Sequence, residues 1–146
     1  MLPITDPAMT RFNISLDDGV EMVLWALENA LGSEIFVPKI PSYRISDVAE
    51  AIAPTVRHEI VGVRPGEKIH EEMITPSDSP NTLDLGQYFA ILPMNKAVVD
   101  NYIARRYATL VPEGFSYNSG TNPEFLDVEQ IRRLIRQHID PEFKPF

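Results

Sequence analysis

Residues 16–31 read LDDGVEMVLWALENAL, and their apolar side chains recur at the spacing of an α-helix. Ser15 can cap the start of this helix, and Asp17 and Asp18 occupy the first turn, where the helix dipole favours anions. Gly32 can end it in the left-handed conformation. One face would carry six aliphatic side chains: Leu16, Val20, Val23, Leu24, Leu27 and Leu31. The stretch therefore predicts a helix over 16–31, with Trp25 as a core-packing residue.

The chain on either side of this helix predicts short elements that alternate in type. Strands are expected over 34–37, 57–63 and 88–92, and helices over 46–53, 67–73, 96–110 and 127–139. Ser46 is the expected cap of the second helix, and Asp127 with Gln130 predicts a capping box on the last. The alternation favours an α/β fold, but the strands are few and short for an independent doubly wound sheet. We therefore expect residues 1–146 to form a single small lobe of a larger protein.

The composition excludes several classes of protein. The chain has 146 residues, no cysteine and a net charge of −8. An excess of acids is the wrong sign for nonspecific binding to nucleic acid or to an anionic membrane. No apolar run reaches the ~20 residues that cross a bilayer, and the N-terminus lacks the features of a secretory signal. We therefore expect a cytoplasmic protein with no disulfide, no thiolate zinc site and neither a nucleic-acid nor a membrane partner.

Two segments that contain arginine are the candidates for binding chemistry. Residues 7–12 read PAMTRF, and residues 63–68 read VRPGEK, with Arg64 at a turn imposed by the Pro-Gly pair. An arginine fork matches phosphate oxygens two at a time, so Arg11 and Arg64 can grip a diphosphate. Glu67 can accept hydrogen bonds from the hydroxyls of a sugar. The alternative is that each arginine forms a surface ion pair with one of the 21 acids.

The other motifs do not support a metal, cofactor or catalytic site. Residues 70–74 read HEEMI and lack the second histidine of a zinc-binding helix. The seven glycines form no dinucleotide-binding fingerprint, and no tyrosine is followed four residues later by lysine. The histidines His58, His70 and His138 are expected to have surface or packing roles. The arginines Arg132, Arg133 and Arg136 are expected to lie on a solvated face of the last helix. We therefore predict that this chain holds no metal, cofactor-binding or catalytic residue.

Several ordered motifs resemble a known family. They are LPITDPAMTRF at 2–12, EIFVPKIPS at 34–42, GVRPGEKIHE at 62–71, FAILP at 89–93, YNS at 117–119 and FLDVE at 125–129. Together they resemble the C-terminal region of inverting UDP-N-acetylglucosamine 4,6-dehydratases, which are extended short-chain dehydrogenase/reductases. The resemblance covers nearly the whole chain, although it is less specific to the particular sugar than to the family.

The resemblance implies the substrate-binding lobe of an NADP-dependent enzyme of surface polysaccharide or flagellin glycan synthesis. Thr10 and Arg11 would contact the nucleotide, Arg64 the diphosphate and Glu67 a ribose or sugar hydroxyl, while Met9 would pack near the base. The missing Rossmann part would bind NADP and supply the catalytic residues, so this chain would bind no cofactor and would be inactive alone. The complete enzyme would be a homo-oligomer.

Two alternatives stay open beside this interpretation. One is a non-catalytic interaction subunit that completes a separately encoded Rossmann chain, and the other is the lobe of a related nucleotide-sugar epimerase or reductase. In each case a lone lobe would expose the apolar surface that normally meets the Rossmann domain.

Overall fold

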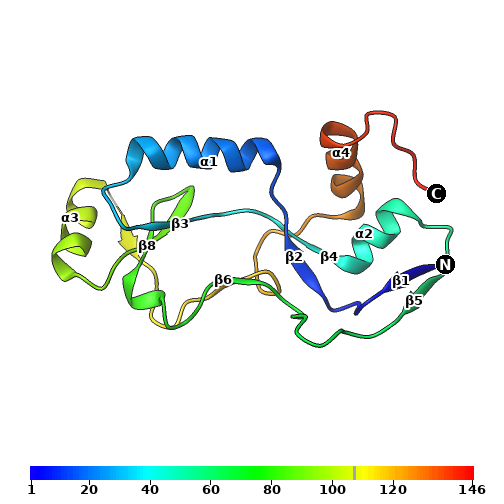
Figure 1. Ribbon diagram of the computed structural model, residues 1–146, viewed down its shortest axis with the longest axis horizontal. Helices are drawn as coiled ribbons and strands as arrows, with labels where there is room; N and C mark the ends of the chain where they lie inside the picture. Colours follow the sequence, from blue (N-terminus) through cyan, green and yellow to red (C-terminus); the bar gives the residue numbers. More distant parts are fainter. Residues whose placement is uncertain (107) are drawn as a thin grey trace. The chain divides into compact units, whose positions relative to one another are not determined.

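The computed structural model describes residues 1–106 and 108–146, and the chain folds into two compact units (Figure 1). The first unit comprises Met1–Ser15, Ile40–Glu71 and Asn118–Phe146, and the second comprises Leu16–Lys39 and Glu72–Tyr117. Both contain short helices and strands, so the predicted mixed α/β class is confirmed. The single lobe over 1–146 stays a prediction.

The first unit contains two pairs of short strands and two helices. Its elements are β1 (Leu2–Ile4), β2 (Thr10–Phe12), β4 (Ser42–Arg44), α2 (Ile45–Ile52), β5 (His58–Ile60) and α4 (Val128–His138). β1 pairs with β5 in parallel, and β2 pairs with β4 antiparallel, with Thr10 opposite Arg44. The β2–β4 pair matters for function, because it fixes the position of the first arginine segment.

An arginine links the two helices of this unit. Arg132 of α4 donates to the backbone oxygens of Ala51 and Glu50, each at 3.1 Å, and its side chain is only 17% exposed. These carbonyls lie in the last turn of α2, where backbone acceptors have no partner within the helix. The predicted solvated position of Arg132 is therefore wrong, because the end of α2 captures its guanidinium.

The capping box of α4 is confirmed. The Asp127 carboxylate accepts from the Gln130 backbone at 2.7 Å, and the Gln130 side chain accepts from the Asp127 backbone at 2.8 Å. Replacing Asp127 with alanine is expected to lower the free energy of unfolding by about 0.5–2 kcal/mol, because one backbone donor of the first turn loses its partner. Urea unfolding measures this loss. Asp127→Asn, which keeps an acceptor oxygen, is expected to retain most of the stability, and equal losses in the two variants would contradict the capping role.

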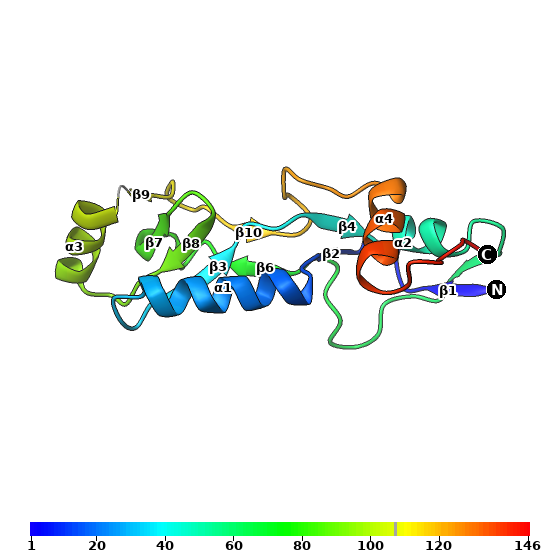
Figure 2. The ribbon, with the colours of Figure 1, turned by 90° about the horizontal axis from the view of Figure 1, so that it is seen from above.

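The second unit is built on a four-stranded antiparallel sheet in the order β3-β8-β7-β9 (Figure 2). These strands are β3 (Ile35–Pro38), β7 (Thr82–Asp84), β8 (Tyr88–Ile91) and β9 (Thr109–Leu110). The other elements are α1 (Leu16–Asn29), β6 (Glu72–Ile74), the 3₁₀ helix η1 (Ser79–Asn81) and α3 (Lys96–Arg106). Strand β10 (Tyr117–Asn118), which pairs with β6, spans the boundary between the two units in the sequence. The predicted strands over 34–37 and 88–92 thus form the β3–β8 ladder.

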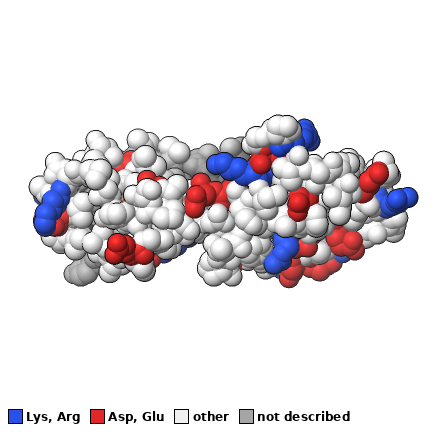
Figure 3. Space-filling model, turned by 90° about the horizontal axis from the view of Figure 1, so that it is seen from below, with Lys and Arg blue, Asp and Glu red and all other residues white. Residues whose placement is uncertain are grey.

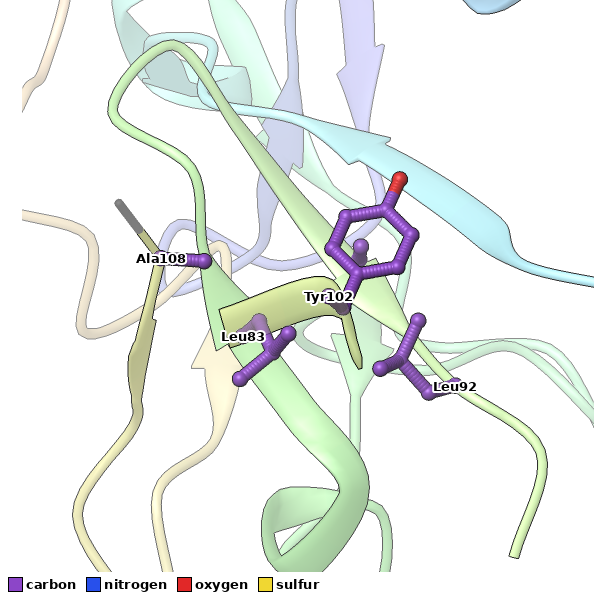
Figure 4. Close-up of a cluster of buried hydrophobic side chains, with 5 residues drawn as sticks. Leu83, Leu92, Tyr102 and Ala108 are labelled. Carbon is purple, nitrogen blue, oxygen red and sulfur yellow. The ribbon is translucent and has the colours of Figure 1, made fainter. Parts of the chain in front are cut away.

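A small apolar core joins this sheet to α3 (Figure 4). Leu83 of β7 and Tyr102 of α3 are fully buried, and Leu92 and Ala108 lie in the same cluster. Phe36, Leu85 and Val99 pack against its edge. The second unit therefore has a core made only of its own residues.

The helix predicted over 16–31 is confirmed as α1, and Gly32 has a φ of 122° just beyond its end. Trp25 packs as predicted, with its ring 5.1 Å from that of Phe36 and 4.5 Å from that of Tyr88. No residue of α1 is fully buried, however. The six aliphatic side chains of its predicted apolar face are between 42% and 84% exposed. This agrees with the expectation that the chain exposes an apolar surface.

Some predicted boundaries are wrong for identifiable reasons. The strand over 57–63 is limited to β5, because Gly62 turns the backbone with a φ of 89°. The helix over 67–73 does not form, because Thr10 and Ser119 donate to the carbonyls of Ile69 and Glu71, and residues 72–74 are β6. Ser46 lies inside α2, which begins after Arg44 without a side-chain cap. The helix over 96–110 ends as α3 at Arg106, residues 109–110 form β9, and Tyr107 lies outside the described residues.

A carboxylate holds the loop before η1. Asp78 accepts from the backbone and the hydroxyl of Thr75, at 2.9 and 2.6 Å, and these bonds hold the pKa of Asp78 below its ordinary value of 3.8. A lowered pKa means that this stabilisation is fully present above pH 3.8 and is lost as the pH falls below it. We expect the Thr75 amide signal to shift in an NMR titration as acid protonates Asp78. The same shift in Asp78→Asn would contradict the assignment.

Candidate functional site

The structure brings the two arginine segments together within the first unit. The backbone of Thr10 donates to the carbonyl of Ile69 at 2.9 Å. The guanidinium of Arg11 donates to the same carbonyl at 3.2 Å and to that of Lys68 at 3.0 Å. Residues 7–12 and 63–71 therefore meet, as a shared binding site requires.

Arg11 is the residue that joins them. Its guanidinium also donates to the Thr10 carbonyl at 2.6 Å and contacts the Met9 sulfur at 3.2 Å, and its Nε lies 3.5 Å from the Glu71 carboxylate. The Arg11 side chain is 23% exposed. Because one planar fork reaches several carbonyls, Arg11 holds β2 against residues 68–71 while keeping part of its charge accessible.

Replacing Arg11 with lysine is expected to lower the free energy of unfolding by about 1 kcal/mol, since a single ammonium cannot satisfy carbonyls on two segments. Thermal unfolding of the purified chain measures the loss. Arg133→Lys, at an exposed arginine of α4, is the control and is expected to change little. Equal unfolding temperatures for wild type and Arg11→Lys would show that Arg11 does not join the segments.

Arg64 lies in an exposed loop built by glycines. Gly62 and Gly66 both have positive φ, at 89° and 86°, which only glycine adopts without strain. The Glu67 carboxylate accepts from the Arg64 backbone at 2.9 Å, and the Glu67 backbone donates to the Arg64 carbonyl at 3.1 Å. The loop therefore fixes its own backbone and leaves the Arg64 side chain, 79% exposed, at its surface.

Arg64 also forms a surface ion pair, which was the alternative expected for the two arginines, but this pair is weak. The Nε of Arg64 lies 3.6 Å from the Glu67 carboxylate. Exposed pairs of this kind contribute about 0–1 kcal/mol, so a doubly charged anion can displace the carboxylate from Arg64. The pairing and the predicted binding role are compatible.

Met9 and Thr10 are buried, with 3% and 4% of their surfaces exposed. The Thr10 hydroxyl lies 2.8 Å from Nδ1 of His70 and shares a hydrogen bond of 2.7 Å with the Ser119 hydroxyl. Ser119 in turn accepts from the Glu71 backbone at 2.8 Å. These two predicted site residues thus form the buried interior behind Arg11, and their contact with a ligand stays a prediction.

His70 and Gly120 complete this polar cluster. A Cβ built on Gly120 would lie 2.6 Å from Nδ1 of His70, so the imidazole occupies the space that a side chain would need. The predicted packing role of His70 is therefore confirmed. Sequence reasoning assigned no role to Gly120, since its contact joins residues 50 positions apart and no local pattern reveals it.

The surface of the chain carries charges of both signs. On the face shown in Figure 3, lysine and arginine side chains lie among aspartate and glutamate side chains. Within residues 1–106 and 108–146, no three histidine, aspartate or glutamate side chains are grouped to hold a metal ion. No helix in the same residues is long and apolar enough to cross a bilayer.

Comparisons with known proteins agree on the kind of protein. The chain is 46% identical to an inverting UDP-N-acetylglucosamine 4,6-dehydratase of Campylobacter jejuni over 139 residues, which is 92% of this chain and 42% of the relative. It is 32% identical to a UDP-glucose 4-epimerase of Rickettsia akari, again over 92% of this chain and 40% of the relative. Its fold matches the X-ray structure of Pen from Bacillus thuringiensis with a TM-score of 0.75 and 26% identity, over 93% of this chain and 41% of that chain.

These matches also fix the extent of the similarity. The chain spans about two fifths of the length of each of these relatives, so it corresponds to one part of their fold. The family model described as polysaccharide biosynthesis protein matches residues 1–93, which include both arginine segments. The chain therefore belongs to the polysaccharide biosynthesis protein family.

Proposed function

We propose that this chain is the nucleotide-sugar-binding portion of a UDP-N-acetylglucosamine 4,6-dehydratase. The observation that carries the proposal is the junction made by Arg11, which joins the two motif segments through the carbonyls of Lys68 and Ile69. The 46% identity to the Campylobacter jejuni dehydratase supports the choice of substrate.

The exposed loop would supply the polar contacts to the ligand. Arg64 would exchange its weak pairing with Glu67 for a bidentate contact with the diphosphate, because the guanidinium fork matches phosphate oxygens. Glu67, released from that pairing, would accept a hydrogen bond from a ribose or sugar hydroxyl. Arg11 and Thr10 would contact the nucleotide, and Met9 would pack near the base. Met9 and Thr10 are buried, so the surrounding residues hold their side chains in place.

The redox chemistry would reside in the part of the relatives' fold that lies outside the matched region. The glycines of this sequence form no dinucleotide-binding fingerprint, so its residues do not fit NADP, which the Rossmann part of a complete cytoplasmic homo-oligomer would hold. This chain would bind and orient the UDP-sugar. We therefore expect no turnover by the chain alone.

Two assays test this proposal. Equilibrium dialysis is expected to show that UDP-N-acetylglucosamine binds, that UDP competes with it and that N-acetylglucosamine does not. Incubation of the purified chain with UDP-N-acetylglucosamine and NADP is expected to give no 4-keto-6-deoxy product. Competition by N-acetylglucosamine but not by UDP would contradict the diphosphate clamp, and any product would refute the inactivity of the chain.

A second candidate is the corresponding part of a nucleotide-sugar epimerase. The similarity to UDP-glucose 4-epimerases of Rickettsia over the same share of the chain favours it, but at 32–39% rather than 46% identity. Tighter binding of UDP-glucose than of UDP-N-acetylglucosamine in the same dialysis experiment would select this candidate.

A further inference from the structure

Three side chains of the first unit are joined by hydrogen bonds behind Arg11, and we call His70, Thr10 and Ser119 the Thr10 network. The Thr10 hydroxyl lies 2.7 Å from the hydroxyl of Ser119 and 2.8 Å from Nδ1 of His70. At its other end, the Ser119 hydroxyl accepts from the Glu71 backbone at 2.8 Å. Ser119 is fully buried and Thr10 is 4% exposed, so the two hydroxyls depend on partners within the protein.

Among the residues that the structure describes, only one arrangement of protons gives both hydroxyls an acceptor. A backbone N–H can only donate, and a hydroxyl has one proton to donate. Ser119 therefore accepts from Glu71 and donates to Thr10, and Thr10 donates to Nδ1 of His70. A proton on Nδ1 would reverse the last bond, and the proton of Thr10 or of Ser119 would then lack an acceptor, which is unfavourable for a buried donor. The network therefore favours neutral His70 with its proton on Nε2.

Residues 68–71 carry both His70 and the groups that hold Arg11. The guanidinium of Arg11 donates to the first two carbonyls of this segment, at 3.0 and 3.2 Å, and its Nε lies 3.5 Å from the Glu71 carboxylate. The Thr10 network fastens the same segment through the His70 side chain and the Glu71 backbone. A displacement of His70 would therefore move the acceptors that set the direction of the guanidinium.

We propose that His70 and Ser119 are positioning residues of the nucleotide-sugar site, which act through Thr10 to hold Arg11 in its ligand-binding direction. A side chain that is already held in place loses less conformational entropy when a ligand binds, so the ligand binds more tightly. The inference rests on the proposed function, because it names the residues that support one of the proposed ligand contacts. It requires Nδ1 of His70 to accept a hydrogen bond, and it assigns no contact between His70 and the ligand.

The first test determines which ring nitrogen of His70 carries the proton in the wild-type chain. Nitrogen-15 NMR at mildly alkaline pH separates the two neutral tautomers, because protonated and unprotonated ring nitrogens have different chemical shifts. We expect an unprotonated Nδ1 and a protonated Nε2. A proton on Nδ1 would overturn the proposal, because Thr10 could not then donate to His70.

The second test compares two substitutions of similar shape at His70. Both remove the imidazole, but only His70→Asn keeps an acceptor near the position of Nδ1. His70→Leu is expected to weaken UDP-N-acetylglucosamine binding about tenfold in dialysis and to broaden the NMR signal of the Arg11 Nε–H. His70→Asn is expected to recover most of both. His138→Leu, at an exposed histidine of α4, is the matched control and is expected to change neither.

A double variant tests whether His70 and Ser119 act through the same partner. Their hydrogen bonds meet at Thr10, so Ser119→Ala and His70→Leu interrupt one network. The double variant is therefore expected to bind about as weakly as the weaker of the two single variants. Effects on binding that multiply would show that the two residues act independently and would overturn the proposal, as would equal effects of His70→Leu and His70→Asn.

Failure of the proposed function would give a different result from failure of this inference. Absence of binding by the wild type, together with an Arg11 Nε–H signal that His70→Leu broadens, would refute the proposed function and leave the positioning of Arg11 standing. Binding by the wild type that His70→Leu leaves unchanged would refute the positioning role and leave the proposed function standing.

Discussion

Replacing Arg64 with alanine is expected to remove most of the affinity for UDP-N-acetylglucosamine, a loss of about 2–5 kcal/mol. The physical reason is that a diphosphate covered by protein would be left without its bidentate partner. Arg64 is 79% exposed without ligand and its loop fixes its own backbone, so the substitution is expected to leave folding unchanged. Isothermal titration of UDP-N-acetylglucosamine into wild type and variant measures the loss.

Two variants make this prediction specific. Arg64→Lys is expected to bind with intermediate affinity, because an ammonium group keeps the charge but not the planar fork. Arg133→Ala removes an exposed arginine of α4 and is expected to leave binding unchanged. Equal affinities for wild type and Arg64→Ala would show that Arg64 has no role beyond its surface ion pair with Glu67.

Gly120→Ala is expected to destabilise the first unit by about 1–3 kcal/mol, the usual range for overpacking. The new Cβ would lie 2.6–2.7 Å from three ring atoms of His70, and the imidazole is held in place by the Thr10 hydroxyl. Relief of the clash requires the ring to move and to give up that hydrogen bond. Urea unfolding is the measurement.

A glycine in open space is the control for this substitution. Gly19 of α1 has no heavy atom within 4 Å of a built Cβ, so Gly19→Ala is expected to raise stability by about 0.5–1 kcal/mol through helix propensity. The double variant Gly120→Ala with His70→Ala lacks the obstructing imidazole, and it is expected to recover part of the lost stability. Unchanged stability of Gly120→Ala alone would contradict the packing of His70 against Gly120.

Local sequence predicted the helices with clear periodicity or end signals, α1 and α4, but it also predicted a helix over 67–73 that does not form. Periodicity gave α1 to within two residues at its C-terminal end, and the Asp127–Gln130 pair gave the start of α4. The strands β1 and β2 were not predicted, because each has three residues and exists through a partner far along the chain, as β1 does with β5. A three-residue run carries too little pattern to separate such a strand from a loop.

The candidate site was predictable from its motifs but not in its geometry. The spacing of residues drew attention to Arg11 and Arg64, and the structure brings their segments together. The bonds from Arg11 to the carbonyls of Lys68 and Ile69 leave no trace in local sequence, because every residue has a carbonyl. The burial of Met9 and Thr10 was missed for the same reason, since it depends on residues that pack from other segments.

Helix α1 shows a further limit of periodicity. Its six aliphatic residues mark an apolar face, but the pattern alone does not say whether this chain or another surface covers it. The sheet of this chain covers the face that carries Trp25 instead. The structure therefore decides which face of α1 the sheet covers, and the periodicity does not.

The central claim is that residues 7–12 and 62–71 form a nucleotide-sugar site. The most direct test is an amide-resolved NMR titration of the chain with UDP-N-acetylglucosamine. We expect the largest shifts at Arg64, Glu67 and Arg11, with small changes on α3 in the second unit. Saturating ligand that shifts none of these three amides would contradict the claim.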